Sequence, residues 1–368
     1  MFINNINELH PEVWESLLRR RGQLPHALLL TGQRGVGKFA LARAFAALLL
    51  CEASSSNTAA CGECLACKWF LQGNHPDFRL IRPAAWEEEE EAEEPKKGET
   101  SKADSGAEKG KKASRQIVIE QIRGLDDFLH VGTHRQGLRI VLIHPAEAMN
   151  RASANSLLKS LEEPVASTLF ILVSDEADRL LPTIRSRCQK VAVPLPEGKI
   201  AAEALRSAGV DDAGRWLALA GGAPLLALEL AQAGESESLN ALLGVLRNGG
   251  SGVFDPLQGA ALLDQALKKE KGAAAPMKQL IEWGQKWLFD LNLAAVDLPP
   301  RYFVAEKEQL SRLSRAMDHP RFLQFLKKAL EYKEQSEHPL NTRLFLEDFL
   351  MNYGALFAQR KPPLQFSR

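Results

Sequence analysis

The feature that most constrains this chain is a glycine-rich loop placed between a strand-like and a helix-like segment. Residues 32–39 read Gly-Gln-Arg-Gly-Val-Gly-Lys-Phe. The apolar run His26–Leu30 precedes the loop, and Lys38–Leu50 follows it with helical apolar spacing. In the pattern G-x-x-x-x-G-K-[ST], such a loop joins a strand to a helix whose first amides bind phosphate. The sequence therefore predicts an α/β domain of the phosphate-loop type.

The loop departs from this pattern at its last position. Phe39 stands where a Ser or Thr hydroxyl would bind Mg²⁺. Gly32, Gly35, Gly37 and Lys38 could still cradle a phosphate, although glycines also suit a tight turn with no ligand. We therefore interpret the loop as a degenerate, vestigial nucleotide site and expect no ATP binding by this chain, with weak phosphate binding left open.

A second departure follows the next buried strand, which is predicted over Leu138–Ile143. Phosphate-loop ATPases place an acidic pair after this strand, to hold the metal and to polarise the attacking water. Here the strand is followed by His144-Pro145, and Glu147 could substitute only if the backbone register shifted. Both departures remove the same metal-dependent step, so we expect the chain by itself to be no enzyme.

The remaining pattern divides the chain into three parts. A buried run at Thr168–Val173 and a helix over Ser153–Glu163 continue the alternation of strands and helices that is typical of a parallel sheet covered on both faces. After about Pro196 the strand signal ends and only helical spacing follows. We predict three domains: an α/β domain over 1–195, a small helical domain over 196–238 and a larger all-α domain over 239–368.

Residues 87–114 form a low-complexity insert in the α/β domain. Seven of the eight residues Glu87–Glu94 are Glu, and Lys, Gly, Ser and Ala follow them. We predict that this segment is disordered, because burying so few apolar side chains cannot offset the conformational entropy lost on folding. The insert is either a tolerated loop insertion or a charged interaction tail.

The overall composition narrows the function classes. The 368 residues include 46 basic and 46 acidic ones, so the formal net charge is zero. The chain as a whole is therefore no nucleic-acid binder by charge alone. It contains neither a signal-peptide pattern nor 18 consecutive apolar residues, so we expect a cytoplasmic protein with no membrane partner.

Four of the five cysteines lie close together in the sequence. Cys51, Cys61, Cys64 and Cys67 follow the spacing C-x₉-C-x₂-C-x₂-C. Four thiolates complete a tetrahedral zinc shell and leave no open position, which predicts a structural Zn²⁺ site in a module over 51–67. The alternative is four unligated thiols in a polar loop. Cys188 stands apart and is interpreted as a small buried residue.

Two further segments carry a family resemblance. Ala154–Pro164 reads A-N-S-L-L-K-S-L-E-E-P, and Pro182–Cys188 reads P-T-I-R-S-R-C. Both resemble signatures of the bacterial DNA polymerase III clamp-loader subunits, a branch of the AAA+ family. Gly73–Asp77 and the cysteines after the first helix also fit, whereas the resemblance weakens over the C-terminal helices. It implies an AAA+ α/β domain, a helical lid and a C-terminal α-helical collar.

The resemblance also implies a role and partners. Such loaders are open rings of five subunits that use ATP, bound between neighbours, to load a sliding clamp onto primed DNA. The implied partners are motor subunits of the gamma/tau type and a delta subunit, with the clamp and DNA reached through the complex. Arg187, beside Ser186, matches the trans arginine finger that reaches a neighbour's γ-phosphate. The alternative is an internal salt bridge of Arg187.

Two other positions fit a subunit that does not hydrolyse ATP. Ser174 matches the first sensor position of the family, and Gly221–Pro224 lies where active relatives carry a second sensor arginine. The alternative for Gly221–Pro224 is a turn that breaks a helix. The competing hypotheses are an active motor subunit of the same loader and a zinc-dependent nucleic-acid binding module. Phe39 and His144 argue against the motor, and a cysteine segment poor in basic and aromatic residues argues against the module.

One group of apolar residues is left with two interpretations. Trp283, Trp287, Leu288 and Leu291 follow helical spacing in the C-terminal part. They form either an interface between subunits or the core of their own domain.

Overall fold

The structure is a computed structural model, and it describes residues 6–53, 58–86, 114–130, 137–234, 236–269, 276–336 and 341–357. The chain forms two compact units, the first of residues 1–204 with 223–225 and the second of 205–222 with 226–368. The predicted insert lies outside the described residues, except for Ser114. The boundaries at 196 and 239 stay a prediction, because compactness divides the chain only in two.

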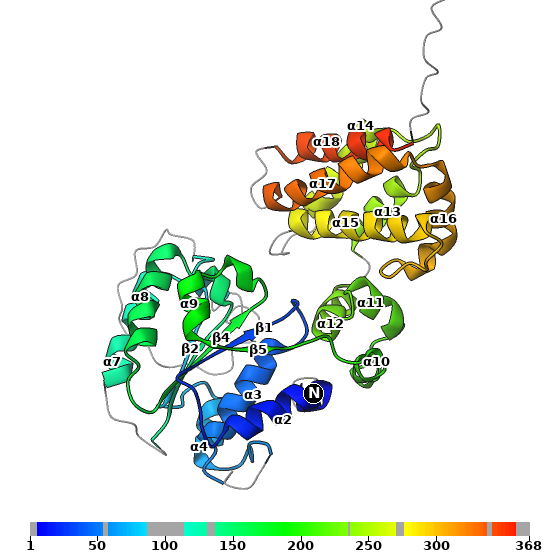
Figure 1. Cartoon of the computed structure of the whole chain (residues 1–368). Coiled ribbons are helices and arrows are strands. Elements are labelled where there is room, and N and C mark those ends of the chain that lie inside the picture. Colours follow the sequence, from blue (N-terminus) through cyan, green and yellow to red (C-terminus); the bar gives the residue numbers. More distant parts are fainter. Residues whose placement is uncertain are drawn as a thin grey trace, which may run out of the picture. The chain divides into compact units, whose positions relative to one another are not determined.

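The first unit is built on a parallel sheet of five strands in the order β2-β3-β4-β1-β5 (Figure 1). The three strands predicted from buried apolar runs are confirmed and lie at its centre, and the two edge strands were not predicted. The strands are β1 (Ala27–Thr31), β2 (Phe78–Ile81), β3 (Arg139–Ile143), β4 (Thr168–Ser174) and β5 (Gln189–Ala192).

The two edge strands escaped prediction because neither forms a long apolar run. Each has only four residues, and each leaves part of its side chains exposed, unlike the fully buried β1, β3 and β4. An edge strand has a neighbour on one side only, so a long apolar run is not needed there. The central strands, buried on both faces, show the continuous apolar pattern of parallel sheets.

Helices cover both faces of this sheet (Figure 1). Alternate strand residues such as Leu29, Val141 and Phe170 pack with Leu157 and Ile184 into one core cluster. The helices on this face are α6 (Ile119–Arg123), α7 (Leu125–His130), α8 (Arg151–Glu162) and α9 (Pro182–Arg187). The other face is covered by α3 (Lys38–Leu50), with α1 (Ile6–Leu9), α2 (Pro11–Arg20) and α4 (Leu65–Leu71) nearby.

The predicted helices of this unit follow from local signals. α3 matches the helix expected after the loop. α8 begins after Asn150, whose side chain accepts a hydrogen bond from the amide of Ser153, as an N-cap does. It ends at Glu162, two residues before Pro164. The short 3-10 helices η1 (Ala146–Ala148) and η2 (Ala177–Arg179) follow β3 and β4.

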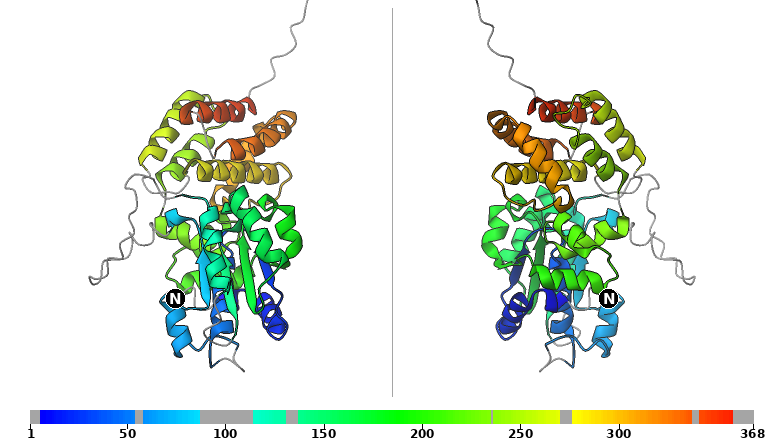
Figure 2. Two further views of the ribbon diagram at one scale, coloured as in Figure 1. Left: turned by 90° about the vertical axis from the view of Figure 1, so that its left-hand side faces the viewer. Right: turned by 90° about the vertical axis from the view of Figure 1, so that its right-hand side faces the viewer.

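The described secondary structure of the second unit is helical, as expected, and further views of the chain are given in Figure 2. α10 (Gly198–Ser207) and α12 (Pro224–Ala233) each run across the division between the units. The other helices are α11 (Ala213–Leu219), α13 (Glu237–Leu246), α14 (Pro256–Lys269), α15 (Pro276–Ala295), α16 (Lys307–Ala316), α17 (His319–Gln335) and α18 (Thr342–Ala355), with η3 (Val304–Glu306).

The apolar residues with two interpretations belong to the core of this unit. Trp283, Trp287, Leu288 and Leu291 of α15 are all buried within the chain. The indole of Trp287 donates a hydrogen bond to the Tyr353 hydroxyl on α18, at 3.0 Å. Their helical spacing therefore reflects internal packing. Among the described residues, no single helix is long and apolar enough to cross a membrane, although one bent pair, α11 with α12, meets the length and composition test.

Candidate functional site

The phosphate loop lies between β1 and α3, as its pattern predicts, and its glycines are required by the backbone. A Cβ atom on Gly32 would lie 2.3 Å from the carbonyl oxygen of Val193. Gly37 is the residue before α3 and has φ +101°, a conformation that other residues rarely adopt. Gly35 also has a positive φ. The loop therefore has the shape that brings backbone amides to a helix N-terminus.

Other segments of the first unit hold this loop in place. The imidazole of His10 donates to the carbonyl of Val36 at 2.7 Å, and burial is the main cause that lowers the pKa of His10. The amide of Leu225 donates to the carbonyl of Gly35 at 2.9 Å. The loop is thus fixed through its own carbonyl groups, from both N-terminal and C-terminal segments of the unit.

The lysine of the loop points into the protein. The side chain of Lys38 is 2% exposed, and its ammonium lies 2.6 Å from Oδ1 of Asp175. It also donates to the carbonyls of Gly32 and Gln33, each at 2.7 Å. Three oxygens of the chain itself therefore surround the group that would bind a phosphate.

The two substituted metal positions are in direct contact. The rings of Phe39 and His144 are stacked with centroids 4.6 Å apart and planes 17° apart. Trp86 meets His144 edge-on, with centroids 5.7 Å apart. Burial is the main cause that lowers the pKa of His144 to about 4; the charge of Asp175 opposes this shift, and Lys38 adds to it by a smaller amount. His144 is thus neutral near pH 7, and this aromatic group offers no oxygen ligand for Mg²⁺.

Glu147 does not take the place of the missing acidic pair. Its Oε1 accepts hydrogen bonds from the amides of Asp175 and Glu176, at 2.9 and 3.3 Å. Oε2 is buried and has no hydrogen-bond partner among the described residues, and the same is true of the Ser174 hydroxyl. Glu147 therefore supports the turn after β4, and this set of residues does not fit a magnesium–nucleotide complex.

Arg187, the predicted arginine finger, lies at the end of α9 on the surface. Its side chain is 34% exposed and forms an ion pair with Glu162, 49% exposed, at 2.7 Å. It also donates to the carbonyl of Thr183 at 3.0 Å, which accepts from the Ser186 hydroxyl as well. The neighbouring Arg185 is paired with Asp178 instead. The internal salt bridge considered from the sequence is therefore present, but it lies at the surface.

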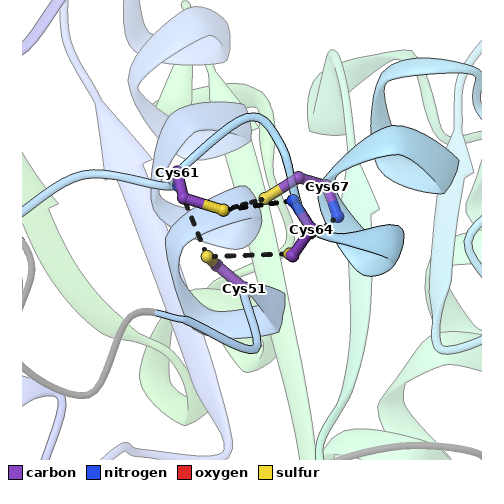
Figure 3. Close-up of side chains that lie close together, drawn as sticks. All are labelled: Cys51, Cys61, Cys64 and Cys67. Atoms are coloured by element: carbon purple, nitrogen blue, oxygen red, sulfur yellow. Dashed lines mark hydrogen bonds between the residues drawn. The ribbon is translucent and has the colours of Figure 1, made fainter.

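The four clustered cysteines come together after α3 (Figure 3). Their sulfur atoms all lie within 4.8 Å of one another, with 4.0 Å between Cys51 and Cys64 and 3.8 Å between Cys61 and Cys67. A tetrahedron of sulfurs around a metal at about 2.3 Å has edges of roughly 3.8 Å. The geometry therefore fits one tetrahedral metal ion.

Backbone amides also favour thiolates in this cluster. The amides of Cys61, Cys64 and Cys67 each donate to a cluster sulfur at 3.3 to 3.4 Å. Such bonds from Cys64 and Glu63 lower the pKa of Cys61 to about 6, whereas burial raises the pKa of Cys67. Burial also raises the pKa of the separate Cys188, to about 11, which agrees with its interpretation as a small buried residue.

The parallel sheet, the loop after β1 and the S-R-C helix before β5 define a protein of the AAA+ class. The model of the family described as "DNA polymerase III, delta subunit" matches residues 9–196, just over half of the 368 residues. The chain belongs to this family. The subunit type predicted from the motifs is delta-prime, and it is confirmed by curated relatives that carry this name.

These relatives are similar to the chain over part of its length. The chain is 41% identical over 219 residues to DNA polymerase III subunit delta' of Pseudomonas aeruginosa, covering 58% of each. It is 32% identical over 177 residues to that of Escherichia coli K12, covering 48% of this chain and 45% of the relative. The matches thus span less than two thirds of these relatives. A solved Thermotoga maritima gamma subunit-related protein is 18% identical, with TM-score 0.41, covering 94% of this chain and 100% of that one.

The site also contains residues that the sequence did not single out. Asp175 pairs with Lys38, Trp86 contacts His144, and His10 holds the loop at Val36. A signal for Asp175 existed, because it directly follows a central buried strand, and the carboxyl ends of parallel strands meet at one edge of a sheet. His10 and Trp86 are distant from the loop in sequence, so no local pattern could reveal them.

Proposed function

We propose that this chain is the non-hydrolysing subunit of a clamp loader, acting in ATP-driven loading of a sliding clamp onto primed DNA. The observation that carries this is the state of its own phosphate loop. Lys38 is held by oxygens of the chain, and the Phe39–His144 stack stands where metal ligands are needed. The loop is then a degenerate site, and the chain by itself is no enzyme.

The test is the ATPase activity of the purified chain. We expect no turnover above background at saturating Mg²⁺ and ATP. Any turnover that Lys38→Met abolishes would contradict the proposal, because contaminating ATPases do not depend on this residue. Such a result would favour the alternative of an active motor subunit, a class to which some weaker relatives belong by name, such as a Buchnera gamma subunit at 30% identity over 167 residues.

Arg187 is the group that we propose to act on a neighbour's nucleotide. Its side chain is 34% exposed, it follows Ser186 at the end of the short helix α9, and its partner Glu162 is half-exposed. A guanidinium with several donors can exchange a surface carboxylate for the developing charge on a γ-phosphate. The proposed partners are gamma/tau motor subunits and a delta subunit in a five-membered ring, in the cytoplasm.

The second unit is the proposed lid and collar. Its described secondary structure is helical, and it exposes large apolar side chains that its own core does not cover, including Leu323, Leu330, Leu344 and Met351. Helices that pack between subunits would need such surfaces. A chain lacking residues 239–368 should then fail to assemble with motor subunits in size-exclusion chromatography.

We propose that the cysteine cluster holds a structural Zn²⁺. The sulfur separations and the amide hydrogen bonds to the sulfurs support four thiolate ligands with no open position. Metal analysis should give one zinc per chain, and Cys64→Ser should lose it. Cys188→Ser, outside the cluster, is the matched control and should keep the metal. A zinc-free protein of unchanged thermal stability would contradict the assignment.

A further inference from the structure

The phosphate loop contains an ion pair that the proposed function leaves unexplained. Loss of metal ligands at Phe39 and His144 removes catalysis, but it does not by itself prevent the loop from binding phosphate. The loop keeps its three glycines and its lysine, and the glycines retain the required backbone shape. Phosphate binding to the loop must therefore be controlled by a group other than Phe39 and His144.

Phosphate binding requires free N–H donors on the ammonium of Lys38. An ammonium has three N–H groups and no acceptor. The three oxygens within 2.7 Å of this nitrogen belong to Gly32, Gln33 and Asp175. Two of them are neutral carbonyls of the loop itself, and the third is a carboxylate. Every donor of the lysine therefore has a partner within the chain, and Asp175 supplies the negative charge.

Asp175 is firmly placed for this contact. Its amide donates to Glu147 at 2.9 Å, and the amide of Glu176 donates to the same oxygen. Asp175 directly follows β4, whose last residue Ser174 pairs in register with Thr31 at the start of the loop. The carboxylate of Asp175 thus belongs to a turn that hydrogen bonds to Glu147 hold in place beside the loop.

We propose that Asp175 is the residue that excludes phosphate from the loop, by occupying Lys38 as an internal anion. This inference rests on the proposed function, since it explains how a loop of intact glycines can remain without nucleotide. A phosphate would have to displace the carboxylate from a lysine that is 2% exposed. It would also meet the negative charge of Asp175 at short range, in a site where water screens little.

The exclusion of phosphate is separate from the loss of catalysis. Asp175 acts on the phosphate-binding lysine, whereas Phe39 and His144 occupy the positions of metal ligands. Removing the carboxylate should therefore permit anion binding without restoring hydrolysis. This separation makes the two ideas testable one at a time.

The experiment is calorimetric titration of the full chain with sodium tripolyphosphate in the absence of divalent metal. The wild type should show no saturable binding. Asp175→Ala should bind at least tenfold more tightly than the wild type, and Lys38→Met in the Asp175→Ala background should abolish the gain. Asp178→Ala is the matched control, because this exposed aspartate pairs with Arg185 at 2.9 Å, and it should behave as the wild type does.

Two outcomes would overturn the inference: saturable, Lys38-dependent binding by the wild type, or no gain in any correctly folded variant at Asp175. Asp175→Asn, which keeps the shape and removes the charge, serves if the alanine variant does not fold. ATPase activity of these variants should stay at background in every case. Turnover in the wild type would instead contradict the proposed function, so the two failures are distinguishable.

Discussion

The cations of the two nucleotide-related motifs, Lys38 and Arg187, differ in where they lie. Lys38 is 2% exposed and donates to three oxygens of its own chain, whereas Arg187 is 34% exposed and shares a surface ion pair. An exposed pair is worth only about 0–1 kcal/mol, so it exchanges partners at low cost. A buried charge that loses its partner is expensive. The comparison teaches that burial separates the two cations: Lys38 is held by its own chain, whereas Arg187 lies where the proposed function needs it to reach a neighbouring subunit.

The largest effect is expected on the exposed side of this comparison. In a reconstituted loader, Arg187→Ala should slow ATP turnover at the neighbouring subunit's site by about 10³-fold, the lower range for trans arginine fingers. Pre-steady-state phosphate release should resolve this as a slow phase, while size-exclusion chromatography shows an intact complex. Arg185→Ala is the matched control, since it removes a guanidinium two residues away.

An unchanged phosphate-release rate in Arg187→Ala would end the assignment. A loss of the same size in both arginine variants would point to a general disturbance of α9. In either case the contrast between an inward lysine and an outward arginine would lose its functional meaning.

A pH effect is expected on the buried side. The pKa of His144 is lowered to about 4 in the folded chain, so between that value and its ordinary 6.5 the unfolded chain binds the extra proton. The free energy of unfolding should therefore fall as the pH drops from about 6.5 to 4, by at most about 3 kcal/mol. Lys38 and Arg82 oppose protonation here, and Asp175 favours it.

Urea unfolding at several pH values measures this effect. His144→Phe keeps a ring to stack on Phe39 and removes the titration, so its stability should change less over the same window. Some dependence will remain, because the pKa values of His10 and His75 are also lowered by burial. An identical pH profile for the variant and the wild type would exclude His144 as the source.

The two partners of the Lys38–Asp175 ion pair should differ in how much stability is lost when each is removed. Asp175→Ala leaves the ammonium of Lys38 buried with only carbonyl partners. We expect this change to lower the free energy of unfolding by about 2 kcal/mol, less than for a fully buried pair, because Asp175 is 26% exposed. Lys38→Met removes the buried charge and leaves Asp175 partly in water, so it should cost about 1 kcal/mol or less. Chemical denaturation measures both, and the reverse order would contradict the burial argument.

These residues also show how far the sequence alone could lead. Phe39, His144 and the cysteines were identifiable because each breaks or completes a local pattern, and the central strands because they are continuous apolar runs. The sequence does not show that Phe39 and His144 are in contact, because this depends on how the fold arranges the strands of the sheet. Asp175 was missed although its place directly after a buried strand was a signal, because that place does not show which side chain it meets. Its role depends on which side chain the fold places opposite.

The smallest effect is expected for the partner of the exposed arginine. Glu162→Ala removes the carboxylate that pairs with Arg187, but both side chains are at least one third exposed. The free energy of unfolding should therefore change by only about 0.5 kcal/mol. Because the guanidinium is released and not removed, loader turnover should stay within about twofold of the wild type.

Glu163→Ala, at the adjacent exposed glutamate, controls for the loss of a charge at the end of α8. Glu162→Ala could slow turnover as strongly as Arg187→Ala while Glu163→Ala does not. That result would mean that the ion pair with Glu162 is needed to position Arg187. Arg187 would then resemble Lys38, because each cation would depend on a carboxylate of its own chain. If turnover is unaffected, the arginine is free to exchange Glu162 for a neighbour's phosphate.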